Sequence, residues 1–182
     1  MQNVFIRQSR IQGRGVFALK GFRKNETILQ IDDSHVVLDE SALTDVDLEY
    51  NADFFDGKII IMQEPERCIN HSCDPNCYVK TIDGIRNVLA LRDIAEGEEI
   101  TFDYAINGDN EGTFLCHCGA KRCRQIYLGD FFRLPVELQK EYLPYLEDWF
   151  VQKHQGKIEA LKNTNDIDDV KSWIIITNSN RL

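Results

Sequence analysis

Six cysteines in two tight clusters constrain this 182-residue chain more than any other feature of its sequence. The clusters are Cys68, Cys73 and Cys77, then Cys116, Cys118 and Cys123 in a C-x-C-x4-C pattern. Residues 1–7 lack the basic start and apolar stretch of a signal peptide, so we expect an intracellular protein with reduced thiols. Three thiols within eight residues then predict a metal site rather than a disulfide framework.

Zinc suits such a site because thiolates bind it and structural zinc takes four tetrahedral ligands. The second cluster supplies three of them, and the first can supply the fourth, although spacing alone does not choose among Cys68, Cys73 and Cys77. His117 could substitute, but its place between two candidate ligands favours an outward side chain. The alternative is a set of ordinary buried thiols, which behave as small hydrophobic residues.

The charge of the chain is unevenly distributed. The net charge is −9, and residues 39–66 hold nine acidic residues against one basic residue. Because affinity for nucleic acid depends on Lys and Arg that neutralise phosphate, we expect no direct nucleic-acid binding. The acidic run either attracts a basic polypeptide or is simply a solvated loop. No apolar run approaches the roughly 20 residues of a membrane span, so no membrane partner is expected.

The length predicts one domain, with a short extension, at roughly 150 residues per domain. Short β segments rich in β-branched residues and separated by turn signals are predicted at 16–18, 27–31, 35–38, 59–62, 87–91 and 100–104. Two helices are predicted at about 135–142 and 144–155, each with proline at its start. Residues 157–182 remain ambiguous, because the W-I-I-I run at 173–176 fits a docked strand or a helix end.

The segment R-C-I-N-H-S-C-D-P-N at 67–76 gathers many hydrogen-bonding groups around a turn. Alone it could be a satisfied polar turn, but three further motifs occur in order around it. They are G-R-G-V-F-A at 13–18, E-E-I-T-F-D-Y at 98–104 and C-H-C-G-A-K-R-C at 116–123. Together they resemble the SET-domain family of protein-lysine methyltransferases, over residues 5 to about 127.

The resemblance implies a mainly β fold of short curved sheets with a pseudoknot, in which the T-F-D-Y segment passes through a loop formed by N-H-S-C-x-P-N. A zinc-binding post-SET segment and C-terminal helices would follow. The expected division is 1–112 for the SET domain, 113–129 for the post-SET segment and 130–182 for the helical extension. No cysteine precedes residue 68, so no pre-SET zinc cluster is expected.

The resemblance also assigns residues to roles. The catalytic residues would be Tyr104, at the methyl-transfer channel, and Phe102, whose lack of a hydroxyl implies di- or trimethylation. The residues binding S-adenosylmethionine would be Arg14, Gly15, Asn70, His71, Tyr104 and Phe114. The zinc ligands would be Cys73, Cys116, Cys118 and Cys123.

Some positions depart from the family pattern or stay open. Cys68 stands where the family usually has phenylalanine, so Cys68 and Cys77 are expected to be packing residues. Phe114 or Tyr127 would line the lysine channel. A second channel aromatic is Tyr50, Phe54 or Phe55, among which the loose alignment does not choose.

The implied activity is S-adenosylmethionine-dependent lysine N-methylation of a histone tail or similar basic peptide, with the acidic run 39–66 forming one wall of the peptide groove. A non-histone substrate and a non-catalytic SET-like binding module are the alternatives, and the presence of Asn70, His71 and Tyr104 together favours an enzyme. The protein would act in the nucleus if eukaryotic, the cytoplasm if bacterial, or a host nucleus if viral or a secreted effector. Its oligomeric state stays open.

Overall fold

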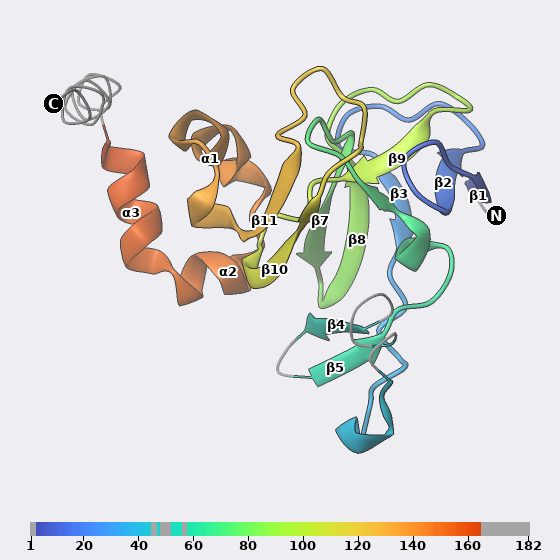
Figure 1. The fold of residues 1–182 in the computed structure, drawn as a ribbon, viewed down its shortest axis with the longest axis horizontal. Helices are drawn as coiled ribbons and strands as arrows, with labels where there is room; N and C mark the ends of the chain where they lie inside the picture. Colours follow the sequence, from blue (N-terminus) through green and yellow to red (C-terminus); the bar gives the residue numbers. More distant parts are fainter. Residues whose placement is uncertain (1–2, 45–46, 48–51, 56–57, 165–182) are drawn as a thin grey trace, which may run out of the picture.

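The structure is a computed structural model that describes residues 3–44, 47, 52–55 and 58–164. Its strands are β1 (Val4–Gln8), β2 (Arg14–Ala18), β3 (Thr27–Gln30), β4 (Ala52–Phe55), β5 (Lys58–Ile61), β6 (Asn70–His71), β7 (Cys77–Ile82), β8 (Ile85–Ala90), β9 (Glu99–Phe102), β10 (Asp109–Leu115) and β11 (Ile126–Asp130). Its α-helices are α1 (Val136–Tyr142), α2 (Asp148–Lys153) and α3 (Gln155–Asn163). The chain is therefore mainly β with helices at its C-terminal side, as predicted (Figure 1).

The main sheet runs in the order β1-β2-β9-β7-β8-β3, with β6 paired to β9 outside this path. Its core forms where β-branched residues of the central strands face inward, since such side chains pack well on a pleated surface. Val16, Val88 and Ile100 are all at most 1% exposed. Strands β4 and β5 form a separate two-stranded sheet, as do β10 and β11.

The segment from β6 to the start of β7 closes around the end of β9. Strand β6 pairs with β9 in parallel, and Cys77 at the start of β7 pairs with Phe102 on β9. Between them, Asn76 accepts a 2.8 Å hydrogen bond from the Thr101 N–H and donates a 2.7 Å bond to the Glu99 carbonyl. The two motifs that the family resemblance predicts to cross are thus in direct contact.

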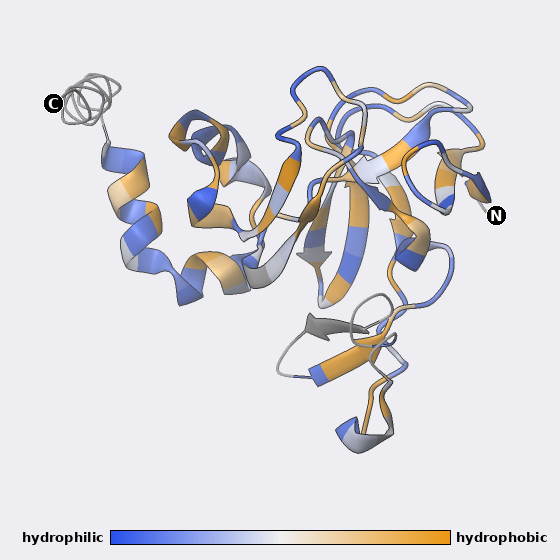
Figure 2. Cartoon of the chain, in the orientation of Figure 1, coloured by the Kyte–Doolittle hydropathy of each residue, from blue (hydrophilic) through white to orange (hydrophobic). Residues whose placement is uncertain are grey.

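The hairpin β10–β11 connects the sheet to the helices (Figure 1). Tyr127 on β11 belongs to a second hydrophobic core, which the segments beside the hairpin share with the C-terminal helices. This core is formed by Ala105, Ile106, Tyr127, Phe131, Leu134, Tyr142, Leu146, Phe150, Ile158 and Leu161. Figure 2 shows hydrophilic and hydrophobic residues alternating along α3, where Ile158 and Leu161 are the buried positions. The expected boundaries at 112/113 and 129/130 fall inside β10 and β11, and the division of the chain stays a prediction.

The first predicted helix is confirmed as α1, which Pro135 precedes. The single predicted helix at 144–155 is wrong, since this stretch holds a 3-10 turn at Leu143–Tyr145, then α2 and the start of α3. The chain is extended at Leu146 and Glu147, because the Glu147 carboxylate turns inward to accept hydrogen bonds from the N–H and hydroxyl of Thr81.

Among the predicted strands, 35–38 is reduced to a single antiparallel bridge between Val36 and Ile60. Two backbone hydrogen bonds flank the bridge, from the Val37 N–H to the Ile59 carbonyl and from the Ile61 N–H to the His35 carbonyl. The W-I-I-I run at 173–176 lies outside the described residues. None of the described helices has the length and apolar character needed to cross a bilayer.

Candidate functional site

The candidate site lies where β6, the end of β9 and the hairpin β10–β11 meet, with His71 at its centre. The His71 ring centroid lies 5.2 Å from Tyr104, 5.7 Å from Phe114 and 5.3 Å from Tyr127. Phe114 and Tyr127 stack on each other at 4.5 Å across the hairpin. Phe114 remains 42% exposed, so this aromatic cluster has a face that a ligand can cover.

Tyr104 is held at both its backbone and its hydroxyl. Its N–H donates to His71 Nδ1 at 3.3 Å, and its hydroxyl donates to the Ile69 carbonyl at 2.7 Å. Burial raises the pKa of Tyr104 to about 12, and burial likewise lowers the pKa of His71 to about 4. Near neutral pH the phenol is therefore a protonated donor, beside a neutral imidazole.

Phe102 lies close to Tyr104, with the two ring centroids 6.1 Å apart. It is half-buried and packs against both hydrophobic cores. Two residues that the resemblance assigns to catalysis are therefore neighbours at the end of β9.

Asn70 is oriented by a set of acceptors around its amide nitrogen. Nδ2 lies 3.2 Å from the Gln12 carbonyl, 3.1 Å from the Arg14 carbonyl and 2.9 Å from Glu99 Oε1. Because Nδ2 has two hydrogens and all its neighbours are acceptors, the carbonyl end Oδ1 is directed the other way. The site thus presents a hydrogen-bond acceptor at this position.

Gly15 leaves open the space that the Glu99 carboxylate occupies in this structure. A Cβ built at Gly15 would lie 2.3 Å from Glu99 Oε1, an oxygen that also accepts a 2.7 Å bond from the Ser9 hydroxyl. The expectation from the sequence was close approach of the backbone to a cofactor, and it gave no role to Glu99. The residue was missed because nothing in the motif shows which side chain fills the space beside a glycine.

Arg14 contributes its backbone to the site rather than its guanidinium. Its carbonyl accepts from Asn70, whereas its side chain pairs with the Glu64 carboxylate at 2.5 and 3.2 Å. Hydrogen bonds from Arg14 and Arg67 lower the pKa of Glu64 to about 2, so the pair stays charged near neutral pH.

Four of the six cysteines form one cluster, and they are Cys73, Cys116, Cys118 and Cys123. Their Sγ atoms all lie within 4.8 Å of one another, and Cys116 Sγ is 3.7 Å from both Cys73 Sγ and Cys123 Sγ. Tetrahedral zinc with Zn–S bonds of about 2.3 Å requires sulfurs about 3.8 Å apart, so the arrangement fits this ion.

The surroundings of the cluster also fit thiolate ligands. Backbone N–H groups of Arg124 and Gln125 donate to Cys73 Sγ at 3.3 Å and Cys123 Sγ at 3.4 Å. Without an ion, burial raises the pKa of the Cys73 thiol to about 11 and also raises that of Cys116. Burial opposes ionisation of Cys118 too, but backbone hydrogen bonds from Cys73 and Ala120, with bonds from the other cysteines, lower its pKa to about 7. Such donors stabilise the negative charge that zinc ligation requires.

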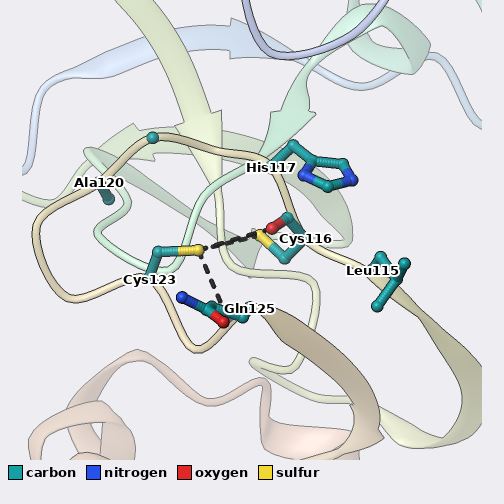
Figure 3. A pocket seen from close by; sticks show the side chains of 7 residues that line it. Leu115, Cys116, His117, Ala120, Cys123 and Gln125 are labelled. Carbon is teal, nitrogen blue, oxygen red and sulfur yellow. Dashed lines mark hydrogen bonds between the residues drawn. The ribbon is translucent and has the colours of Figure 1, made fainter.

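The remaining candidate ligands lie elsewhere. Cys68 and Cys77 belong to the core of the main sheet, where burial raises the pKa of the Cys77 thiol. The side chain of His117 is exposed and lies away from the Cys123 sulfur, beside a cavity that Cys116 and Gln125 also line (Figure 3).

A buried carboxylate, Asp103, joins the site to the rest of the molecule. It is fully buried and accepts two hydrogen bonds from Arg124, at 2.7 and 2.8 Å, and one from the Tyr142 hydroxyl at 3.1 Å. Its Oδ1 lies 3.7 Å from His71 Nδ1. Sequence reasoning missed this network, for which the only signals were an aspartate inside the T-F-D-Y motif and an arginine directly after the last cysteine.

The acidic run and the second channel aromatic are only partly described. Tyr50 lies outside the described residues, and so do the side chains of Phe54 and Phe55. Two carboxylates of the run make local contacts, because Asp39 caps Ser41 and Asp47 accepts from Thr44.

Comparison with known proteins gives a consistent family. A model of the SET domain matches residues 13–105. Human histone-lysine N-methyltransferase 2B is 34% identical over 143 residues, covering 67% of this chain and 5% of that protein. Histone-lysine N-methyltransferase trithorax of Drosophila virilis is 33% identical over 138 residues, covering 67% of this chain and 4% of that protein. The chain thus spans about a twentieth of the length of these curated relatives.

A solved structure is also similar. It is the crystal structure of a candidate histone methyltransferase of Plasmodium falciparum, with a TM-score of 0.49 and 25% identity. The similarity covers 57% of this chain and 94% of that one.

Proposed function

Because the chain belongs to the SET-domain family, we propose that it is an S-adenosylmethionine-dependent protein-lysine N-methyltransferase. The observation that carries the proposal is the convergence of Asn70, His71 and Tyr104 beside the stacked pair Phe114 and Tyr127. These residues come from β6, the end of β9 and the hairpin β10–β11, so the fold itself assembles them.

The residues present fit the cofactor. Asn70 offers Oδ1 as an acceptor for an ammonium group, and the exposed face of Phe114 suits a flat or cationic group. His71, Tyr104 and the backbone of Arg14 and Gly15 would complete the binding site. When bound, S-adenosylmethionine supplies a sulfonium methyl group to the lysine amine.

Tyr104 would orient the reacting groups rather than accept a proton, since its pKa of about 12 keeps it protonated. Its hydroxyl and the Ile69 carbonyl, 2.7 Å apart, form a polar pair beside the aromatic rings. Fixed geometry of this kind favours an in-line transfer. Burial of the substrate lysine among apolar rings lowers the pKa of its amine, so no strong general base is needed.

We assign the cysteine cluster to one structural zinc ion. Four cysteine ligands fill the tetrahedral coordination, which is typical of structural rather than catalytic zinc. Cys73 follows β6, and the other three ligands lie in the segment 116–125 that joins β10 to β11. The ion would therefore fasten the hairpin, with Phe114 and Tyr127, against His71.

The substrate we propose is a histone tail or a similar basic peptide, with the acidic run 39–66 attracting it electrostatically. The phenyl group of Phe102 offers no hydrogen bond that would hold a partly methylated amine, which supports di- or trimethylation. Such a substrate agrees with action in a nucleus, including a host nucleus, or on a basic cytoplasmic protein.

The test is transfer of labelled methyl from S-adenosylmethionine to purified core histones and, in parallel, to a lysate rich in basic proteins. We expect labelled lysine, identified by mass spectrometry of the product. A zinc-loaded protein that neither binds the cofactor nor labels any protein would contradict the proposal and favour a non-catalytic binding module.

A further inference from the structure

The Asp103 network extends beyond the part of the chain that the SET-domain match covers. That match ends at residue 105, whereas Arg124 follows the last cysteine and Tyr142 ends helix α1. Tyr142 is fully buried in the second core, yet its hydroxyl reaches Asp103 Oδ2 at 3.1 Å. A residue of the helical extension therefore touches the residue directly before Tyr104.

Asp103 controls the backbone at Tyr104. Its Oδ1 accepts a 3.1 Å hydrogen bond from the Ala105 N–H, and its carbonyl accepts from the Ile106 N–H at 2.9 Å. An aspartate that bonds the backbone two residues ahead fixes a tight turn. Tyr104 lies inside this turn, so the Asp103 carboxylate helps to fix the backbone that carries the tyrosine.

The Asp103 carboxylate is held by hydrogen bonds from two side chains, those of Arg124 and Tyr142. Arg124 bonds both oxygens, and the Tyr142 hydroxyl adds a second donor to Oδ2. The attraction within a buried ion pair offsets the cost of desolvation only if the geometry is good and further hydrogen bonds satisfy the remaining lone pairs. Arg124 also donates its backbone N–H to Cys73 Sγ, so the same pair of residues connects the turn to the cysteine cluster.

We propose that Tyr142 is a positioning residue for methyl transfer: its hydroxyl fixes Asp103, and Asp103 fixes the turn that presents Tyr104. This inference rests on the proposed function and makes the C-terminal helices part of the catalytic architecture. Helix α1 would then increase the rate of the chemical step without touching the cofactor or the substrate.

The test variant is Tyr142→Phe, which keeps the buried ring and removes only the hydroxyl. We expect kcat to fall about tenfold, the scale of one hydrogen bond to a charged group, with KM for cofactor and histone within about twofold of the original. A role in packing alone would lower the melting temperature and leave kcat unchanged at a temperature well below it. The matched control is Tyr145→Phe, on the next turn, whose ring packs on Tyr78.

A second measurement does not depend on activity. Amide hydrogen exchange in a peptide covering 103–106 should become about tenfold faster in Tyr142→Phe and stay unchanged in Tyr145→Phe. The original protein could transfer no methyl while amide exchange at 103–106 still becomes faster in Tyr142→Phe. In that case the proposed function fails, and the role of the Tyr142 hydroxyl in positioning the turn stands. If the protein is active and Tyr142→Phe changes neither kcat nor exchange, the inference is overturned.

Discussion

At the residue scale, Gly15 matters through the side chain it makes room for. In Gly15→Ala the added Cβ would displace the Glu99 carboxylate, which lies 2.3 Å from the Cβ position and holds the Asn70 amide. We expect the dissociation constant for S-adenosylhomocysteine to rise about tenfold, the scale of one charged hydrogen bond, as measured by calorimetry.

The double variant Gly15→Ala with Glu99→Asp should recover part of that affinity, because the shorter carboxylate leaves space for the methyl group. Gly21→Ala is the control, since its Cβ would lie in ordinary contact, 3.5 Å from the Ile94 carbonyl. If the affinity for S-adenosylhomocysteine is unchanged in Gly15→Ala, the orientation of Asn70 by Glu99 does not support cofactor binding.

The side chain at position 102 is expected to control how many methyl groups are transferred. Phe102→Tyr introduces a hydroxyl close to Tyr104, whose ring centroid is 6.1 Å away, and this hydroxyl can hold the amine or a water by a hydrogen bond. We expect the product to shift toward monomethyl-lysine, counted by mass spectrometry, while Phe5→Tyr on β1 leaves the distribution unchanged. An identical product distribution in both variants would remove Phe102 from control of methyl number.

The sequence identified site residues that lie within local motifs, and it missed those whose place depends on contacts between distant segments. Cysteine spacing predicted a metal site but could not choose between Cys68, Cys73 and Cys77, because the choice depends on how the β6–β7 segment closes around β9. The resemblance selected Cys73, and its sulfur lies in the cluster. Glu99 and Tyr142 make contacts with distant segments, to Asn70 and Asp103, which no local pattern encodes.

At the scale of elements, the hairpin β10–β11 should depend on zinc. In Cys116→Ser we expect loss of the zinc ion that we propose for the cysteine cluster, measured by atomic emission. Because loss of a structural metal is among the most destabilising changes, we expect a decrease of about 4 kcal/mol in the free energy of unfolding. Chelation should have the same effect on the original protein. The control variant His117→Ala should keep its zinc, since the His117 side chain is exposed. A full zinc content in Cys116→Ser would contradict the assignment of Cys116 as a ligand.

Elements with strong local signals were predicted best. Pro135 and the apolar spacing after it predicted α1, whereas the stretch 144–155 was predicted as one helix because Leu146, Trp149 and Phe150 fit a helical repeat. The break comes from a tertiary contact, since Glu147 bonds Thr81 and its N–H donates to Asn107 Oδ1 at 2.8 Å. Helical periodicity does not report such a contact.

At the scale of the whole molecule, Glu147 links the helices to the main sheet and should make stability depend on pH. It is 3% exposed, and burial raises its pKa above the usual 4.5 despite the hydrogen bonds from Thr81. When folding raises the pKa of an acid, the folded state binds its proton more tightly than the unfolded state. The resulting contribution to the free energy of unfolding is fully present below the pKa of the unfolded state and is lost as the pH rises through the pKa of the folded state.

The original protein should therefore lose stability relative to Glu147→Gln as the pH rises from 4.5 towards neutrality. Urea unfolding of both proteins at each pH measures the difference, and effects common to both, such as protonation of zinc ligands, cancel. A difference that stays constant over this range would show that Glu147 does not titrate differently in the folded state.

The overall fold was predictable because four motifs in a fixed order resemble one family, and the described main sheet brings the motifs at 13–18, 67–76 and 98–104 together. The arrangement of the helices was not predictable, because their hydrophobic core and their polar contacts with the sheet both join segments that lie far apart in the sequence. Lys80 on β7, for example, bonds the Leu146 carbonyl at 2.7 Å and Asp148 at 2.6 Å.

The central claim is that Tyr104 orients methyl transfer at a site built from β6, β9 and the hairpin. Its most direct test compares single-turnover methyl transfer and cofactor affinity in the original protein and in Tyr104→Phe. We predict that the rate falls by about a hundredfold, the scale of lost orientation at a reacting centre, while the dissociation constant for the cofactor stays within about twofold. Transfer at the original rate by Tyr104→Phe would contradict the account.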